Sequence, residues 1–117
     1  MAGGTKRFLV VDDERHVVRL IQVNLERNGC HVTVAHGGQQ AIDILSQQSF
    51  DRVFVDYDMP QVNGYQVLEF IRTNERLKGI WVLLVTTRSD DREAIMGFPH
   101  KADSYGEKPF NPVDWMD

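Results

Sequence analysis

Short apolar runs alternate along this chain with stretches whose apolar residues recur at helical spacing, and this alternation limits the fold more than any other feature. Four apolar runs of strand length lie at residues 8–11, 31–35, 53–55 and 80–85, and a weaker fifth lies at 103–107. Such runs are typical of strands that are buried on both faces. Strands that alternate with helices predict a mostly parallel sheet with helices on both faces, an α/β fold.

Three of the intervening stretches carry an apolar stripe at the spacing of a helix. The first stripe occupies 17–25 and is followed by Gly29, a residue type that suits the position just after a helix. The other two stripes occupy 41–45 and 65–71. We therefore expect three amphipathic helices, each packed on the sheet by its apolar stripe.

A fourth helix is expected to begin near Ser89 and Asp90, where Glu93 is placed to complete a capping box. Gly97 and Pro99 follow closely, and both residue types interrupt helices. The fourth helix should therefore be short or distorted.

Length and composition limit the remaining possibilities. The 117 residues suit one domain, so we expect residues 1–117 to form it without an output domain. The single cysteine, Cys30, excludes an internal disulfide and a cysteine zinc site, and we expect it to be a buried thiol. A net charge of −4 argues against nucleic-acid binding. No apolar run approaches the roughly 20 residues that cross a bilayer, so we expect no membrane contact and a cytoplasmic location.

Polar side chains gather where the predicted strands end, which is where open α/β sheets bind ligands. The residues at these ends are Asp12, Asp13 and Glu14, then Asp56 and Asp58, then Thr86 and Thr87, and finally Lys108. Carboxylates a few ångströms apart repel one another by about 4 kcal/mol per pair at an effective dielectric constant of 20, so a cation is expected between them. Hard oxygen ligands favour Mg²⁺ or Mn²⁺. The carboxylates also argue against a flavin-phosphate pocket, because they would repel the phosphate.

These residues resemble the receiver domain of two-component response regulators, of the kind found in chemotaxis regulators. The resemblance covers nearly the whole chain and rests on Asp12-Asp13, Asp56 with Met59-Pro60 and Gly64, Thr86, and Lys108-Pro109-Phe110. It implies a flavodoxin-like three-layer α/β/α fold with five parallel strands in the order 2-1-3-4-5. It also implies a signalling switch rather than an enzyme.

The resemblance implies that Asp56 accepts a phosphoryl group from a phosphohistidine of a sensor histidine kinase or a histidine phosphotransfer protein. It places Mg²⁺ or Mn²⁺ on Asp13 and Asp56, with Asp12 acting mainly through water and Asp58 through its backbone carbonyl.

Three further roles follow from the same resemblance. Lys108 would pair with phosphoryl oxygens, and its bond to Pro109 is often cis in this family. Thr86 would donate its hydroxyl to the phosphoryl group, and Tyr105 would turn inward as the threonine moves.

One departure from the family pattern lies near this site. Thr87 stands where receivers usually have a small residue, which would narrow access to the acyl phosphate. Asp58 and Arg88 occupy positions that tune phosphoryl lifetime in the family, and their opposite charges are expected to pair across the mouth of the site and slow attack by water.

The end of the chain is a second departure, because receivers normally continue with a full fifth helix. Here Asn111 suits an N-cap and Pro112 the first helical position, but little more than one turn follows. We consider either a chain cut ahead of an output domain or a receiver that lacks this helix. So short a segment is expected to leave a sheet face uncovered, and we predict a homodimer through the side of the fourth and fifth strands.

Two alternative functions remain open from the sequence. A pseudo-receiver would have the same fold but act as a phosphorylation-independent protein-binding or dimerisation module. The triplet 56–58 also resembles the acidic pair of haloacid-dehalogenase-type phosphatases. In those enzymes, however, the triplet follows the first strand and a cap covers the site, and this chain is too short for a cap.

Overall fold

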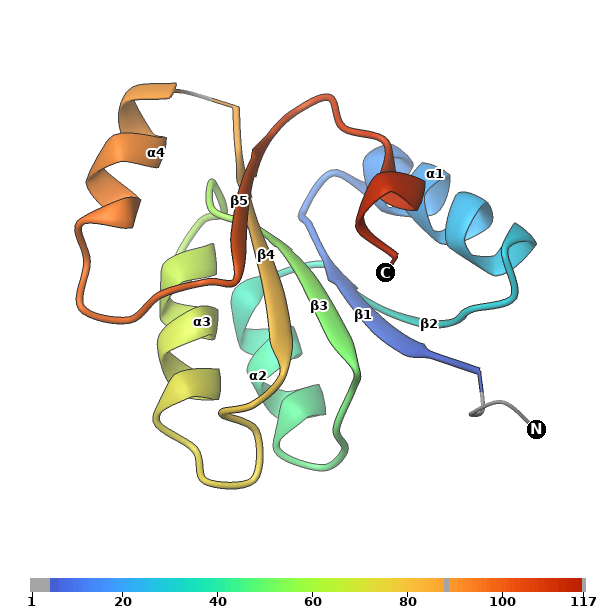
Figure 1. The fold of residues 1–117 in the computed structure, drawn as a ribbon, viewed down its shortest axis with the longest axis horizontal. Helices are drawn as coiled ribbons and strands as arrows, with labels where there is room; N and C mark the ends of the chain where they lie inside the picture. Colours follow the sequence, from blue (N-terminus) through green and yellow to red (C-terminus); the bar gives the residue numbers. More distant parts are fainter. Residues whose placement is uncertain (1–4, 88, 117) are drawn as a thin grey trace.

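Five parallel strands form one sheet in the order β2-β1-β3-β4-β5 in the computed structural model of the chain, which describes residues 5–87 and 89–116 (Figure 1). The strands are β1 (Arg7–Val11), β2 (His31–Ala35), β3 (Arg52–Asp56), β4 (Trp81–Thr86) and β5 (Ser104–Glu107). The expected fold and strand order are confirmed. Asp56 and Thr86 belong to strands rather than following them, because Asp56 still pairs with Val85 and Thr86 with Glu107.

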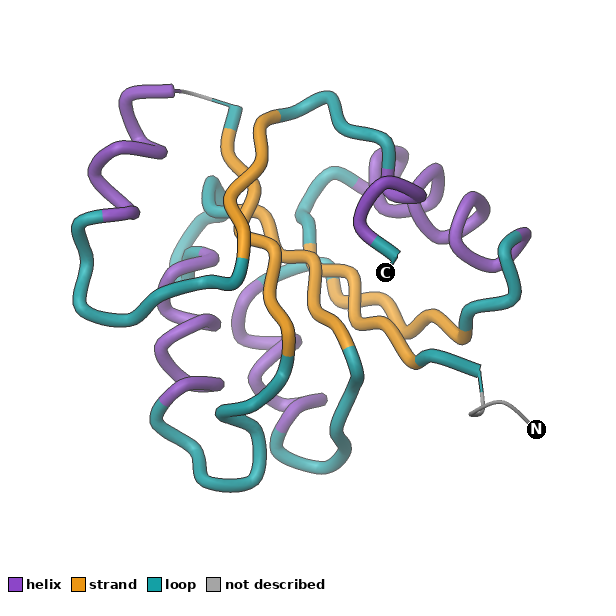
Figure 2. The backbone as a smooth tube through the Cα atoms, in the orientation of Figure 1, coloured by secondary structure: helices purple, strands orange, loops and turns teal. Residues whose placement is uncertain are grey.

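Helices cover both faces of this sheet (Figures 1 and 2). The helices are α1 (Arg15–Arg27), α2 (Gly38–Leu45), α3 (Gly64–Arg72) and α4 (Ser89–Met96). One face packs on α2, α3 and Ile95 of α4, and the other packs on α1 and the C-terminal segment. No helix in the described part of the chain is long and apolar enough to cross a membrane.

Side chains of each central strand alternate between two apolar cores. In β1, Leu9 and Val11 face the core beneath α2 and α3, whereas Phe8 and Val10 face the core beneath α1. Cys30 lies in this second core, so the expectation of a buried thiol is confirmed. Because both faces of the central strands β1, β3 and β4 are buried, these strands are apolar over most of their length, as the sequence indicated.

Helix α1 ends at a glycine turn, as predicted. Gly29 has a φ of 86°, a backbone conformation that glycine adopts more easily than any other residue. Its amide donates to the Glu26 carbonyl, and the Cys30 amide donates to the Leu25 carbonyl. These two bonds form a Schellman motif that ends the helix and leads the chain into β2.

Helix α4 has eight residues, in line with the prediction of a short helix. The capping box predicted there involves the side chains of Ser89 and Asp90, which lie outside the described residues. The loop from α4 to β5 is tied to α3 by Arg72, whose guanidinium donates to the Lys101 carbonyl and pairs with Asp103 at 2.8 Å.

The C-terminal segment forms a 3₁₀ helix, η1 (Pro112–Trp115), with the Asn111 side chain accepting from the Val113 amide at its start. We expected so short a segment to leave the sheet face uncovered, and the structure corrects this expectation in part. The Trp115 ring lies 6.2 Å from that of Trp81. The Arg52 guanidinium lies over Trp81 and donates to the Trp115 carbonyl. Aromatic side chains therefore cover part of the face that this segment is too short to cover with helix.

Candidate functional site

Three carboxylates meet at the carboxyl edge of the sheet. One carboxylate oxygen from each of Asp12, Asp13 and Asp56 lies within 4.8 Å of the other two. The register of neighbouring strands β1 and β3, in which Val11 pairs with Val55, brings these side chains together. Asp12 and Asp56 are buried, with 2% and 4% of their surface exposed, whereas Asp13 is exposed. The cluster is thus closed on the protein side and open on one side to solvent.

Lys108 supplies the positive charge at this cluster. Its Nζ lies 2.5 Å from Asp12 Oδ2, 3.5 Å from Asp56 Oδ1 and 3.3 Å from Glu14 Oε1. Burial by itself would lower the pKa of Lys108, but the hydrogen bond to Asp12 and the charge of Asp56 outweigh it, and the pKa is raised. Lys108 is therefore a fixed cation shared by three carboxylates. Its peptide bond to Pro109 is cis.

Asp56 is the most perturbed acid of the cluster. Burial and the charge of Asp12 raise its pKa to about 7, against the opposing effect of Lys108. Asp56 Oδ1 is buried, and the described residues offer it no hydrogen-bond donor. An unsatisfied buried carboxylate oxygen beside two further carboxylates fits a hard divalent cation such as Mg²⁺, because such an ion supplies the missing charge and accepts oxygen ligands.

Asp58 lies two residues after Asp56, in the loop that follows β3, and points its carboxylate at the end of β4. Asp58 Oδ2 lies 3.3 Å from Thr86 Oγ1 and 3.3 Å from Thr87 Oγ1 and accepts a hydrogen bond from each. From the sequence we expected the Asp58 backbone carbonyl to bind metal and its side chain to pair with Arg88, and we missed the contact of its side chain with the two threonines. The sequence did contain a signal for this contact, because two threonines lie at the end of one strand and an aspartate follows the neighbouring strand. The predicted partner Arg88 lies outside the described residues.

The start of α3 packs closely against the end of β3, where Asp56 lies. Asn63 caps the helix through reciprocal hydrogen bonds with Gln66, at 3.0 Å and 2.8 Å. The Gly64 amide donates to the Tyr57 carbonyl, and a side chain at Gly64 would overlap the backbone of Asp56. Helix α3 therefore fixes the position of the Asp56 backbone.

Tyr105 lies half-buried on β5, opposite Leu84 of β4. Its hydroxyl accepts a 3.0 Å hydrogen bond from the Ala102 amide. The side chain is thus held by the loop between α4 and β5, and its role as a switch stays a prediction.

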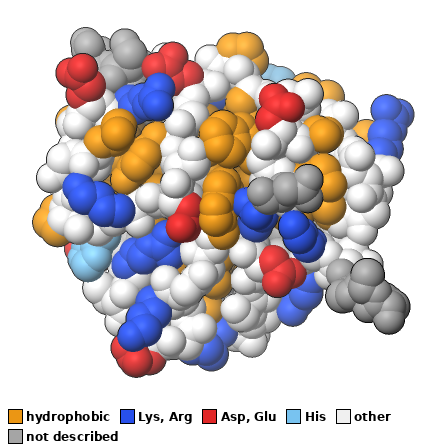
Figure 3. All heavy atoms as spheres, in the orientation of Figure 1, with side chains coloured by type: hydrophobic (Ala, Val, Ile, Leu, Met, Phe, Trp, Pro, Cys, Tyr) orange, Lys and Arg blue, Asp and Glu red, His pale blue; other side chains and the backbone are white. Residues whose placement is uncertain are grey.

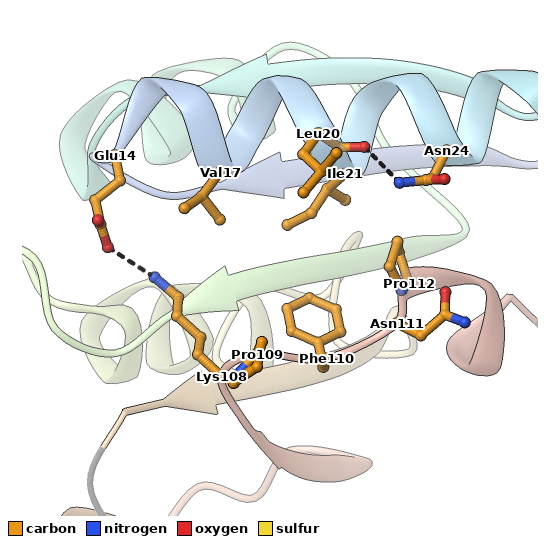
Figure 4. Close-up of a pocket in the computed structure, with 10 residues that line it drawn as sticks. All are labelled: Glu14, Val17, Leu20, Ile21, Asn24, Lys108, Pro109, Phe110, Asn111 and Pro112. Carbon is orange, nitrogen blue, oxygen red and sulfur yellow. Dashed lines mark hydrogen bonds and ion pairs between the residues drawn. The ribbon is translucent and has the colours of Figure 1, made fainter.

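A groove of about 480 Å³ adjoins the carboxylate cluster and runs between α1 and residues 108–112 (Figure 4). Lys108 and Glu14 lie at one end, and the walls beyond them are mainly apolar, including Leu20 and Phe110. Leu20 has 65% of its surface exposed. On the face seen in Figure 3, apolar side chains reach the surface among interspersed charges of both signs.

The family model for the response regulator receiver domain matches residues 8–117. The chain belongs to this family. Receiver domains act in two-component systems, in which histidine kinases are their general partners, and they bind Mg²⁺ at a cluster of acidic residues. Membership of this family removes the haloacid-dehalogenase-type phosphatase from consideration.

Curated relatives of this receiver domain include transcriptional regulators. The transcriptional regulatory protein CpxR of Escherichia coli strain K12 is 36% identical over 105 residues, covering 90% of this chain and 44% of CpxR. The alkaline phosphatase synthesis transcriptional regulatory protein PhoP of Bacillus subtilis is 34% identical over 107 residues, covering 92% of this chain and 44% of PhoP. The chain thus spans less than half the length of these relatives.

Solved structures of receivers superpose closely on this receiver domain. The chemotaxis response regulator CheY4 of Vibrio cholerae is 26% identical with a TM-score of 0.84, covering 93% of this chain and 91% of CheY4. The CheY-like receiver domain protein of Methanospirillum hungatei is 25% identical with a TM-score of 0.85, covering 97% and 89% of the two chains.

Proposed function

We propose that this receiver domain is a phosphoaccepting switch and that Asp56 is its phosphoacceptor. The observation that carries the proposal is the state of the Asp56 carboxylate. It is buried at the sheet edge, its Oδ1 has no hydrogen-bond donor among the described residues, and Lys108 lies 3.5 Å away. An Asp56 oxygen attacks the phosphorus of a phosphohistidine, the P–N bond breaks, and the imidazole leaves with its electron pair.

Divalent metal binding follows from the same cluster. Asp13 and Asp56 would hold Mg²⁺ or Mn²⁺ directly, Asp12 mainly through water, and Asp58 through its backbone carbonyl. The bound ion would supply positive charge to the carboxylates and to the phosphoryl oxygens. Because Asp56 has a pKa of about 7, such charge also favours the ionised form that acts as the nucleophile.

Lys108 and Thr86 would stabilise the product. Lys108 is already held between Asp12 and Asp56, so a phosphoryl group on Asp56 forms within reach of its ammonium. The Thr86 hydroxyl, on the strand beside Asp56, would donate to another phosphoryl oxygen. Tyr105 would then turn inward as Thr86 moves and change the surface of β4 and β5.

The partner would be a sensor histidine kinase or a histidine phosphotransfer protein. We further propose a homodimer through the β4 and β5 side, and no catalysis beyond the domain's own phosphorylation and dephosphorylation. A net charge of −4 argues against direct nucleic-acid binding by these residues. A monomeric sedimentation profile at tens of micromolar would count against the homodimer.

Intact mass after incubation with acetyl phosphate, with and without Mg²⁺, tests the proposal. We expect a phosphoryl adduct that requires Mg²⁺, is absent in Asp56→Asn and is retained in the control Asp43→Asn, which changes an exposed carboxylate on α2. If no adduct forms and the domain binds a protein partner without metal, the pseudo-receiver is the better interpretation.

A further inference from the structure

Two neighbouring hydroxyls at the end of β4 share one carboxylate oxygen. Thr86 Oγ1 and Thr87 Oγ1 each lie 3.3 Å from Asp58 Oδ2. Thr86 is buried, with 2% of its surface exposed, whereas Thr87 and Asp58 are exposed. Asp58 also contributes negative charge at Asp56, whose pKa its charge helps to raise. The Asp58 carboxylate therefore accepts a hydrogen bond from the Thr86 hydroxyl and also acts electrostatically on the phosphoacceptor Asp56.

A threonine hydroxyl has one proton to donate. While Thr86 donates that proton to Asp58, the same proton is not available to a phosphoryl oxygen on Asp56. Hydrogen bonds to an ionised carboxylate are stronger than those between neutral groups, so Asp58 competes with the phosphoryl group for Thr86. Thr87 is the second hydrogen-bond donor to Asp58, and it lies beside the carboxylate cluster of Asp12, Asp13 and Asp56 rather than within it.

We propose that Thr87 is a positioning residue that acts through Asp58 to set how readily Thr86 turns to the phosphoryl group. When Thr86 leaves Asp58, Thr87 stays as the donor to the Asp58 carboxylate and keeps one of its two hydrogen bonds in place. The inference rests on the proposed function, and it assigns to Thr87 a role other than narrowing access to the site.

Two substitutions should act in opposite directions. Thr87→Val keeps the shape of the side chain but removes the donor, so Asp58 depends on Thr86 and holds it more firmly. Asp58→Asn replaces the charged acceptor with a neutral one, so Thr86 is released more easily. Thr87→Ser retains the hydroxyl and is the matched control.

The test is a titration with beryllofluoride, a phosphoryl mimic, at a fixed Mg²⁺ concentration, with the bound form counted by ¹⁹F NMR. We expect Thr87→Val to bind about three- to tenfold more weakly than wild type and Asp58→Asn to bind more tightly by a similar factor. Thr87→Ser should match wild type. Circular dichroism of each variant checks that the fold is intact.

The double variant separates this inference from a simple charge effect. In the Asp58→Asn background, Thr87→Val should change the affinity by less than about twofold, because the carboxylate that coupled the two positions is gone. An equal effect of Thr87→Val in both backgrounds, or equal affinities of Thr87→Val and Thr87→Ser, would overturn the inference alone. If wild type takes up neither beryllofluoride nor a phosphoryl group at Asp56, the proposed function is overturned with it.

Discussion

Gly64 lies so close to the backbone of Asp56 that a side-chain carbon at position 64 would overlap the Asp56 carbonyl oxygen. The contact joins the first residue of α3 to the last residue of β3. Backbone atoms on both sides leave little freedom for either element to shift. The position of the phosphoacceptor therefore depends on the absence of a side chain one loop away.

Gly64→Ala should destabilise the fold and disturb the site together. Overpacking against rigid backbone costs about 1–3 kcal/mol, and the strain falls on Asp56. We expect a lower urea midpoint with an unchanged slope and a slower appearance of the acetyl phosphate adduct. Gly79→Ala is the matched control, because nothing lies within 4 Å of a carbon added there. Equal midpoints for the two variants would contradict the prediction.

Asp56→Asn should make the metal-free domain more stable at alkaline pH. The pKa of Asp56 is about 7 in the fold against 3.8 as an ordinary aspartate, so between these values the folded state binds more protons than the unfolded state. The free energy of unfolding of wild type therefore falls as the pH rises from about 4 to 8. An asparagine does not titrate and escapes this loss.

Urea unfolding in EDTA across this pH range measures the difference. We expect Asp56→Asn to exceed wild type by about 2–4 kcal/mol at pH 8 and the gap to close towards pH 4. Mg²⁺ at pH 8 should narrow the gap, since its charge stabilises the ionised carboxylate. A gap that is independent of pH would show that the charge of Asp56 is not its cause.

Lys108→Met should strengthen Mg²⁺ binding while it weakens phosphorylation. Removing the shared ammonium leaves the carboxylates of Asp12, Asp56 and Glu14 without their cation, so a divalent ion gains more from entering. We expect calorimetry at pH 8.5 to show binding at least about threefold tighter. The acetyl phosphate adduct should fall because the phosphoryl oxygens lose their counter-charge. Lys78→Met, which removes an exposed cation paired with Glu75, should change neither.

Trp115→Ala should show how much the C-terminal turn contributes to stability. The Trp115 ring packs on Trp81, so its removal exposes part of a sheet face, whereas the backbone carbonyl that accepts from Arg52 remains. We expect the free energy of unfolding to fall by about 1–3 kcal/mol. Val113→Ala removes an exposed side chain from the same turn and should cost less than about 0.5 kcal/mol. If both variants cost the same, the contact between the tryptophan rings does not carry the stabilisation.

The sequence predicted the elements best where burial determines residue type on its own. Buried parallel strands must be apolar along their whole length, so 53–55 and 80–85 were readable as strands without knowledge of their neighbours. The weaker strand β5 was also predicted, although its burial is only partial. The predicted ends of β3 and β4 were one residue short, because Asp56 and Thr86 are polar residues that stay in the ladder.

The contacts that sequence reasoning missed depend on which way single side chains point. The Asp58 carboxylate meets Thr86 and Thr87 only because two strand ends and one loop present these groups to one another. The packing of Trp115 on Trp81 likewise needs the chain to cross the sheet after Pro112. The pattern of residue types along a sequence indicates burial and periodicity, whereas these contacts depend on side-chain rotamers and on the path of the chain.

The C-terminal turn also determines where attachments to this domain would sit. Its last described residue, Met116, accepts a hydrogen bond from Lys6, and Trp115 accepts one from the first residue of β3, Arg52. Both described ends of the chain therefore contact residues at or before the amino ends of β1 and β3, whereas Asp56 lies at the carboxyl end of β3. A fluorophore or a fused protein joined at either end would leave the approach to the carboxylates open. Any conformational change that phosphorylation of Asp56 transmits to such a fusion would have to pass through the sheet or its helices.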